Sequence, residues 1–187
     1  MTWDRSCHRY PCPETDHIDR VLNEIEETTL TLSGEMERYC ARVADSRNLQ
    51  SRGRKNVRVG RASDFSVNLT GARGECATSH YLGLPYRGTV NEFRRADLPF
   101  NIEVRTRSNP FYDLKVRPDD DDGRRVVMAV TTGPGQPVRL MGWIVAAEGK
   151  KFPLVDPRDA LLPFHAVPKD SLRPMRELRA IAGKGPY

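Results

Sequence analysis

The 187-residue sequence predicts an α+β or mixed α/β fold with a central mixed sheet of about four to five strands flanked by helices. Three observations lead to this prediction. Apolar residues follow helical spacing in parts of the first eighty or so residues, and alternation and short apolar runs typical of strands occupy residues 102–146. Helical spacing then returns near the C-terminus. Segments rich in Gly, Pro, Asn and Asp separate the strand-like runs.

Residues 1–46 are expected to form an irregular arm followed by a helical hairpin. Thr15 or Asp16 can cap the first helix, whose apolar residues recur at helical spacing: Ile18, Val21, Leu22 and Ile25. A second helix is expected from about Ser33, with one apolar side: Met36, Tyr39, Cys40 and Val43. The hairpin can serve as a packing layer or as the contact of a homodimer, and the sequence leaves both open.

The arm contains Cys7, Cys12 and His17, which are spaced five residues apart. A small zinc site is one interpretation of this spacing. However, a C-x4-C-x4-H pattern lacks the closely paired ligands of structural zinc sites. We therefore prefer an irregular arm without a metal, interrupted by Pro11 and Pro13.

Residues 47–69 are expected to form an exposed basic loop. Its first part has no acidic residue and contains the cations Arg47, Arg52, Arg54, Lys55, Arg58 and Arg61. Such a stretch neutralises phosphates without reading base sequence. A solvated linker is the alternative. The lack of compensating acids, and the position of the loop just before the segment that carries Glu75, favour phosphate contacts.

Residues 70–187 are expected to form the core of the domain and its C-terminal helix. A helix is predicted over residues 70–82, ended by Gly83 and Pro85. The final helix is expected to begin at Asp170 or Ser171. The strands predicted between these helices are residues 102–107, 112–117, 126–130 and 140–146.

The first two predicted strands are expected to pair as a hairpin with one apolar and one charged face. Glu103, Arg105 and Arg107 share a side of the first strand, because alternate residues of a strand point to opposite faces. Matching the apolar faces allows a register that places Arg105 opposite Lys115. An ordinary sheet with one solvated face gives the same alternation. The proximity of Asp97 to the start of the first strand favours a functional carboxylate site.

Charge and hydropathy indicate the class of partner. The net charge is +5, the pI is about 9.2, and Arg far outnumbers Lys. Arg guanidinium groups match phosphate oxygens with two parallel hydrogen bonds, which favours nucleic acid over a membrane surface. No stretch approaches the roughly 18 apolar residues of a membrane helix, and the first residues do not resemble a signal peptide. We therefore expect a cytoplasmic protein without a membrane partner.

A glutamate on a helix, an aspartate, and then a Glu-x-Arg strand resemble the PD-(D/E)xK, or restriction-endonuclease-like, nuclease superfamily. The chain resembles small phage-encoded members of that superfamily, and the resemblance spans about residues 70–178. It implies a restriction-endonuclease-like fold and metal-dependent hydrolysis of phosphodiester bonds in DNA, in the host cytoplasm if the gene belongs to a phage. The matching segments are Gly71–Gly83, Asp97–Arg107, Tyr112–Pro118, Gly142–Ile144 and Val167–Pro168.

The resemblance also implies the metal ligands. Asp97 and Glu103 would hold one or two Mg2+ or Mn2+ ions, which as hard cations prefer oxygen ligands. Glu75 would contribute from its helix, directly or through a water molecule. A bound metal would lower the pKa of its water and stabilise charge on the phosphate.

The cations of the implied site depart from the family pattern. Arg105 occupies the position of the family's lysine, and an arginine stabilises negative charge but does not act as a base near neutral pH. Lys115 is the expected substitute. Arg107 and Arg117 are expected to contact DNA together with the basic loop.

Three alternatives remain open at this point. Asp113 and Lys115 can form the (D/E)xK element instead, with Glu103 as the lone acid. The chain can also be a non-catalytic nucleic-acid-binding protein on the same fold. A phage virion or host-interaction protein, with a basic loop against an acidic partner, is the third alternative.

Overall fold

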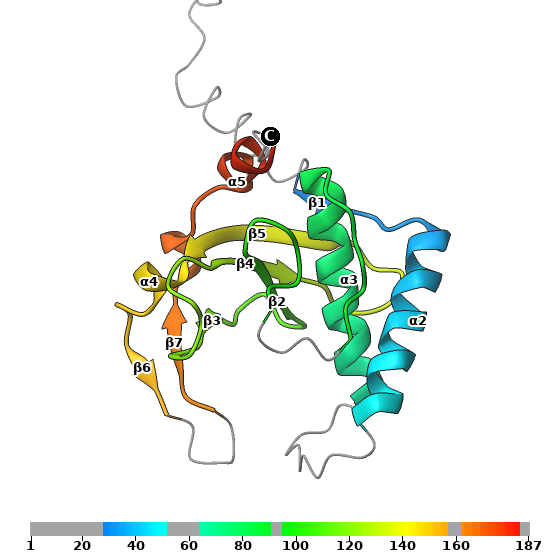
Figure 1. Cartoon of the computed structure of the whole chain (residues 1–187), viewed down its shortest axis with the longest axis horizontal. Helices are drawn as coiled ribbons and strands as arrows, with labels where there is room; N and C mark the ends of the chain where they lie inside the picture. Colours follow the sequence, from blue (N-terminus) through cyan, green and yellow to red (C-terminus); the bar gives the residue numbers. More distant parts are fainter. Residues whose placement is uncertain (1–27, 52–63, 91–94, 157–161, 184–187) are drawn as a thin grey trace, which may run out of the picture.

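The computed structural model describes residues 28–51, 64–90, 95–156 and 162–183 and has a mixed α and β architecture (Figure 1). Helices α2 (Gly34–Ser51) and α3 (Asp64–Leu82) pack side by side. They lie beside a four-stranded mixed sheet, and a smaller three-stranded sheet lies apart from them. The predicted fold class, a mixed sheet of about four strands with flanking helices, is confirmed.

The larger sheet has the strand order β1-β5-β4-β2. Strand β2 runs parallel to β4, whereas β5 is antiparallel to both β4 and β1. In the β2–β4 ladder, Arg105 is the partner of Met128. The strands of this sheet are β1 (Thr29–Leu30), β5 (Val138–Val145), β4 (Arg125–Val130) and β2 (Ile102–Arg107).

The smaller sheet has the order β3-β7-β6, with both pairs antiparallel. The predicted hairpin is therefore wrong, because β2 pairs with β4 and Lys115 is the partner of Ala166. The segment 108–113 does not reverse the chain along β2 but carries it from one sheet to the other. The elements here are β3 (Leu114–Val116), β6 (Leu154–Val155) and β7 (Phe164–Val167), with the short helix α4 (Ala146–Gly149) after β5.

The helices begin and end elsewhere than the sequence predicts. Helix α2 continues to Ser51 and α3 already begins at Asp64, so both ends of the predicted basic loop are helical. The C-terminal helix α5 (Met175–Ala182) follows a 3-10 turn and begins later than expected, because Pro174 stands at its N-cap. None of the helices in the described part of the chain has the length and apolar character needed to span a bilayer.

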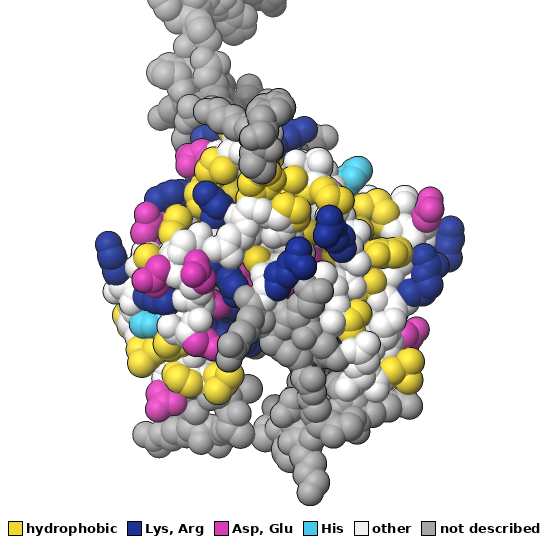
Figure 2. All heavy atoms as spheres, viewed as in Figure 1, with side chains coloured by type: hydrophobic (Ala, Val, Ile, Leu, Met, Phe, Trp, Pro, Cys, Tyr) yellow, Lys and Arg dark blue, Asp and Glu magenta, His cyan; other side chains and the backbone are white. Residues whose placement is uncertain are grey.

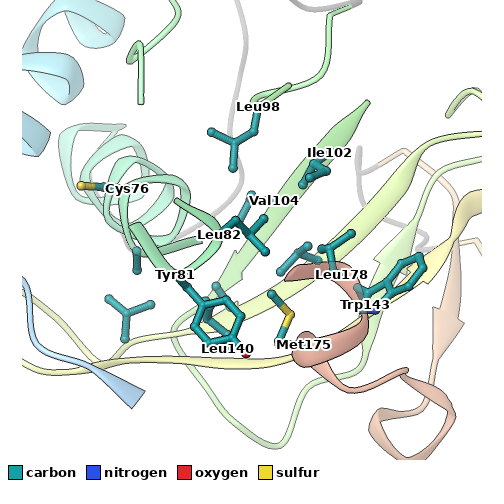
Figure 3. Packing of buried hydrophobic residues seen from close by; sticks show 14 of the residues in the cluster. Cys76, Tyr81, Leu82, Leu98, Ile102, Val104, Leu140, Trp143, Met175 and Leu178 are labelled. Atoms are coloured by element: carbon teal, nitrogen blue, oxygen red, sulfur yellow. The ribbon is translucent and has the colours of Figure 1, made fainter. Parts of the chain in front are cut away.

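Two apolar clusters cover the two faces of the larger sheet. On one face, Ile102 and Val104 of β2 pack with α3 and α5 (Figure 3). On the other face, the apolar residues of β4 pack with Leu114 and Val116 of the smaller sheet. This two-sided burial explains why β4 is a continuous apolar run rather than an alternating one. The opposite side of β2 holds charged residues.

Arg73 ties the helix pair to the turn after β4. Its guanidinium is 1 % exposed and forms a salt bridge with Glu37 of α2, with Nη2 2.8 Å from Oε1 and Nε 3.0 Å from each carboxylate oxygen. It also donates to the Thr131 hydroxyl and to the carbonyl oxygens of Gly133 and Gln136. One side chain therefore satisfies acceptors from two regions of the fold.

Replacement of Gly74 with Ala is expected to destabilise the protein by about 1–3 kcal/mol. Helix α3 approaches β2 so closely that a Cβ on Gly74 would lie 1.9 Å from Thr106 Oγ1. Urea unfolding measures the loss. The double variant Gly74→Ala/Thr106→Ala should recover part of it, because the colliding hydroxyl is gone. A variant as stable as the wild type would contradict this close approach.

Candidate carboxylate and arginine site

The structure brings Glu75, Asp97, Glu103 and Arg105 from three elements toward one region. Glu75 comes from the middle of α3, Asp97 from the segment before β2, and the other two from the charged face of β2. The alternation of β2 is as predicted, since Ile102 and Val104 are buried while Glu103 and Arg105 are partly buried on the opposite face. The same strand thus carries part of the core and part of the site.

Glu75 is held by Arg47 of α2. The two form a bidentate pair in which Nη1–Oε1 and Nη2–Oε2 are each 2.8 Å, and the Tyr86 hydroxyl donates to Oε2 at 3.2 Å. Arg47 also donates to the Thr89 carbonyl oxygen through Nε and Nη2. The prediction of Arg47 in an exposed loop is therefore wrong: it is a helical, partly buried residue that is already paired.

Asp97 is fixed against the start of β2. The Val104 backbone N–H donates to its Oδ2 at 2.8 Å. Burial, and next the negative charge of Glu75, raise the pKa of Asp97 from 3.8 to about 7, against the lowering effects of the Val104 N–H, Arg47 and Arg105. The carboxyl of Asp97 therefore titrates near neutral pH in the absence of a metal.

Glu103 is the third predicted acid of the site. Its pKa is raised from 4.5 to about 7, first by burial and then by the negative charge of Asp97, while Arg105 and Arg124 lower it. Arg105 Nη2 lies 3.1 Å from Glu103 Oε1, and Arg124 Nη1 lies 3.5 Å from Oε2. Glu75 raises the pKa of Asp97, and Asp97 raises the pKa of Glu103, so Asp97 is the acid that interacts with both of the others.

Asp120 is a site residue that the sequence reasoning missed. It is buried, and its Oδ1 lies 2.8 Å from Arg105 Nη2, while the Arg117 backbone N–H donates to its Oδ2 at 2.8 Å. Arg105 is thus held between Glu103 and Asp120. Four consecutive aspartates, residues 119–122, predict a solvated acidic turn, and nothing in the sequence marks the one that turns inward.

Lys115 does not occupy the position expected of it. It lies on β3 of the smaller sheet, with its Nζ 3.9 Å from the centre of the Phe164 ring. Burial lowers its pKa, and the nearby cations Arg107 and Arg117 lower it further. The register that would place Lys115 opposite Arg105 does not occur, so its role as a substitute for the family's lysine loses its structural basis.

A cavity of about 580 Å3 opens beside Asp97. The residues that line it include Arg87, Arg95 and Arg124 together with Asn101. Figure 2 shows Lys and Arg side chains in the middle of this face of the molecule. A carboxylate at the edge of an arginine-lined cavity suits a ligand that brings its own negative charge.

Asp97 and Glu103 fit a hard cation better than Glu75 does. A divalent cation would offset the burial and repulsion that now oppose the ionised forms of Asp97 and Glu103. In contrast, both oxygens of Glu75 already accept hydrogen bonds from Arg47. Among the described residues, no three His, Cys, Asp or Glu side chains form a ready-made metal cluster. Direct coordination by Glu75 would require its pair with Arg47 to open.

Several predicted residues lie outside the described part of the chain. They are the arm residues Cys7, Cys12 and His17 and the basic residues Arg52, Arg54, Lys55, Arg58 and Arg61. His165 lies in β7, where its Nδ1 is 2.8 Å from the Phe152 carbonyl oxygen.

Replacement of Asp97 with Asn is expected to stabilise the metal-free protein at pH 8 but not at pH 4. The pKa of Asp97 is raised from 3.8 to about 7, so the folded state binds more protons and the associated stability is lost as pH rises through 7. Asn carries no charge and retains an acceptor for the Val104 N–H. Urea unfolding of both proteins at the two pH values measures the difference. The same difference at both values would contradict a buried carboxyl that titrates near 7.

Comparison of the chain with family models, with curated proteins and with solved structures finds no match.

Proposed function

We propose that the protein is a metal-dependent nuclease that hydrolyses phosphodiester bonds in DNA and is related to the PD-(D/E)xK superfamily. One observation carries the proposal. Two partly buried carboxyls, Asp97 and Glu103, share a neighbourhood that raises the pKa of each to about 7, and Arg105 stands beside them. Acidic groups with perturbed pKa values next to a cavity are typical of functional sites.

In this proposal Asp97 and Glu103 hold Mg2+ or Mn2+. When bound, the metal would supply a water of lowered pKa and neutralise charge on the phosphate. Arg105 contributes fixed positive charge, held in place by Asp120. Its buried Nε has no hydrogen-bond partner among the described residues. Because an arginine does not deprotonate near neutral pH, Arg105 is assigned no role as a base.

DNA as the substrate is supported by charge. The chain carries a formal net charge of +5, and the cavity beside Asp97 is lined by Arg87, Arg95 and Arg124. Arginine is the side chain best matched to phosphate oxygens. These cations supply the attraction that brings a polyanion to the carboxylates, and the attraction must weaken as salt increases.

Purified protein incubated with plasmid and linear DNA is expected to cleave with Mg2+ or Mn2+ and not with EDTA. Titration of Mn2+ by calorimetry gives a readout independent of cleavage, and Asp97→Asn should weaken the measured binding by about tenfold or more. Glu148→Gln is the matched control, since Glu148 pairs with Arg173 outside the site. Wild-type protein that binds Mn2+ but never cuts DNA would contradict the catalytic proposal.

A non-catalytic nucleic-acid-binding protein is the second candidate. One observation favours it: Arg47, Arg105 and Arg124 already pair with Glu75 and Glu103, so part of the negative charge of the site is neutralised without a metal. DNA binding that weakens with salt, without Mn2+ binding or cleavage under any metal, would support this candidate over the nuclease.

A further inference from the structure

The segment between β2 and β3 presents two aromatic rings to solvent. Phe111 is 85 % exposed and Tyr112 is 52 % exposed. The segment is ordered by a local turn, in which the Phe111 N–H donates to Asn109 Oδ1 at 2.9 Å and the Tyr112 N–H to the Asn109 carbonyl oxygen at 3.4 Å. Because the turn keeps both rings exposed to solvent, they contribute little to the core. Exposed rings of this kind are typical of contact surfaces.

Each of these rings has a cation beside it. The Arg107 guanidinium lies 5.1 Å from the centre of the Tyr112 ring, and Lys169 Nζ lies 5.8 Å from the centre of the Phe111 ring. Lys169 Nζ also donates to the Pro110 carbonyl oxygen at 2.6 Å, which keeps it near the turn. Together with Lys115, these residues form what we call the aromatic–cationic surface: Arg107, Phe111, Tyr112, Lys115 and Lys169.

Lys115 of the aromatic–cationic surface is repelled by neighbouring cations. Arg107 and Arg117 both lower the pKa of Lys115, in addition to the effect of burial. The buried Nε of Arg107 has no hydrogen-bond partner among the described residues. Asp113 is the acid that acts on Arg107 here. A phosphate placed among these groups would reduce their repulsion and accept hydrogen bonds from them.

We propose that the aromatic–cationic surface binds single-stranded DNA, with unpaired bases stacked on Phe111 and Tyr112 and phosphates against Arg107, Lys115 and Lys169. Stacking on an exposed ring needs the open face of a base, which a duplex covers with its neighbours. An acidic protein would neutralise the cations, but it would supply no bases to stack on the rings. The occupant that satisfies both is therefore a strand with unpaired bases.

The position of this surface gives it a role in the proposed nuclease, on which the inference rests. Arg107 lies on the same face of β2 as Glu103, four residues further along. At the rise of a β-strand this is about 13 Å. We infer that the preferred substrate carries a single-stranded segment, because Arg107 of this surface lies only this far from Glu103 along β2.

Fluorescence anisotropy of a labelled oligothymidylate in EDTA tests binding without cleavage. Phe111→Ala and Tyr112→Ala are each expected to weaken binding by about tenfold, since one stacked base is lost. Tyr112→Phe keeps the ring and should bind like the wild type. Leu154→Ala is the matched control, because Leu154 is an exposed apolar side chain of β6, 55 % exposed, outside this surface. Thermal melting checks that each variant is folded.

Unchanged binding by Phe111→Ala and Tyr112→Ala would overturn the inference, whether or not the wild type cuts DNA. Equal losses on a blunt duplex would also overturn it, as would equal displacement by polyglutamate at matched charge, because charge alone would then explain binding. Tighter binding of oligouridylate than of oligothymidylate would overturn DNA as the occupant. Weakened binding in the ring variants, with a wild type that never cleaves, would support this surface and contradict the nuclease.

Discussion

Under the proposed function, replacement of Glu103 with Gln is expected to lower metal-dependent DNA cleavage by roughly two to three orders of magnitude, the effect of removing one preorganised electrostatic contact at a reacting centre. The amide has nearly the same shape but no charge, so it would hold a divalent cation poorly. It retains an oxygen that can accept from Arg105, which lies 3.1 Å from Glu103 Oε1. Single-turnover cleavage rates at saturating Mg2+ measure the effect.

The same variant distinguishes a loss of catalysis from a loss of stability. Burial and Asp97 raise the pKa of Glu103 to about 7, so its ionised form opposes folding at pH 8. Glu103→Gln should therefore be at least as stable as the wild type at that pH, while its cleavage is lost. Asp113→Asn is the informative companion variant, because Asp113 belongs to the alternative (D/E)xK assignment. Cleavage that survives Glu103→Gln but fails in Asp113→Asn would reverse the assignment.

Replacement of Arg73 with Ala is expected to destabilise the fold by about 3–5 kcal/mol. The guanidinium is 1 % exposed and serves Glu37, Thr131 and the carbonyl oxygens of Gly133 and Gln136. Its removal leaves a carboxylate unpaired and backbone acceptors without donors, in addition to a cavity. Urea unfolding at neutral pH measures the loss.

Two further variants show whether the position or the charge of Arg73 matters. Arg73→Lys keeps the charge but cannot reach all of these acceptors at once, so we expect it to recover only part of the stability. Arg139→Ala removes an exposed arginine of β5 and should change stability by no more than about 0.5 kcal/mol. Equal effects of Arg73→Ala and Arg139→Ala would contradict a special role for Arg73 in joining the helices to the sheet.

The fold class and the two faces of β2 could be predicted from the sequence because they depend on short-range patterns. Alternation within residues 102–107 places Ile102 and Glu103 on opposite sides whatever the strand pairs with. The strand that pairs with it could not be predicted in this way. Two neighbouring β-runs favour a hairpin, and only the packing of Leu114 and Val116 against β4 shows that β3 belongs to another sheet.

Asp97, Glu103 and Arg105 could be named as site residues from the sequence, whereas Asp120 and the ion pairs of the site could not. Asp97 and Glu103 stand out because of their place at and before the strand. The pairing of Arg47 with Glu75 joins residues of two different helices, and that of Arg105 with Asp120 joins a strand to a distant turn. Such pairings depend on tertiary packing, which a pattern of residue types along the chain does not encode.

The two-sided character of β2 has a consequence for how this chain tolerates change. Insertion or deletion of one residue within the strand would exchange its faces, bringing Glu103 and Arg105 against α3 and turning Ile102 and Val104 toward the carboxylates. Folding and chemistry would then fail together. Along these six residues, a substitution on one face leaves the other face in place, whereas a change in length that no β-bulge absorbs alters both faces.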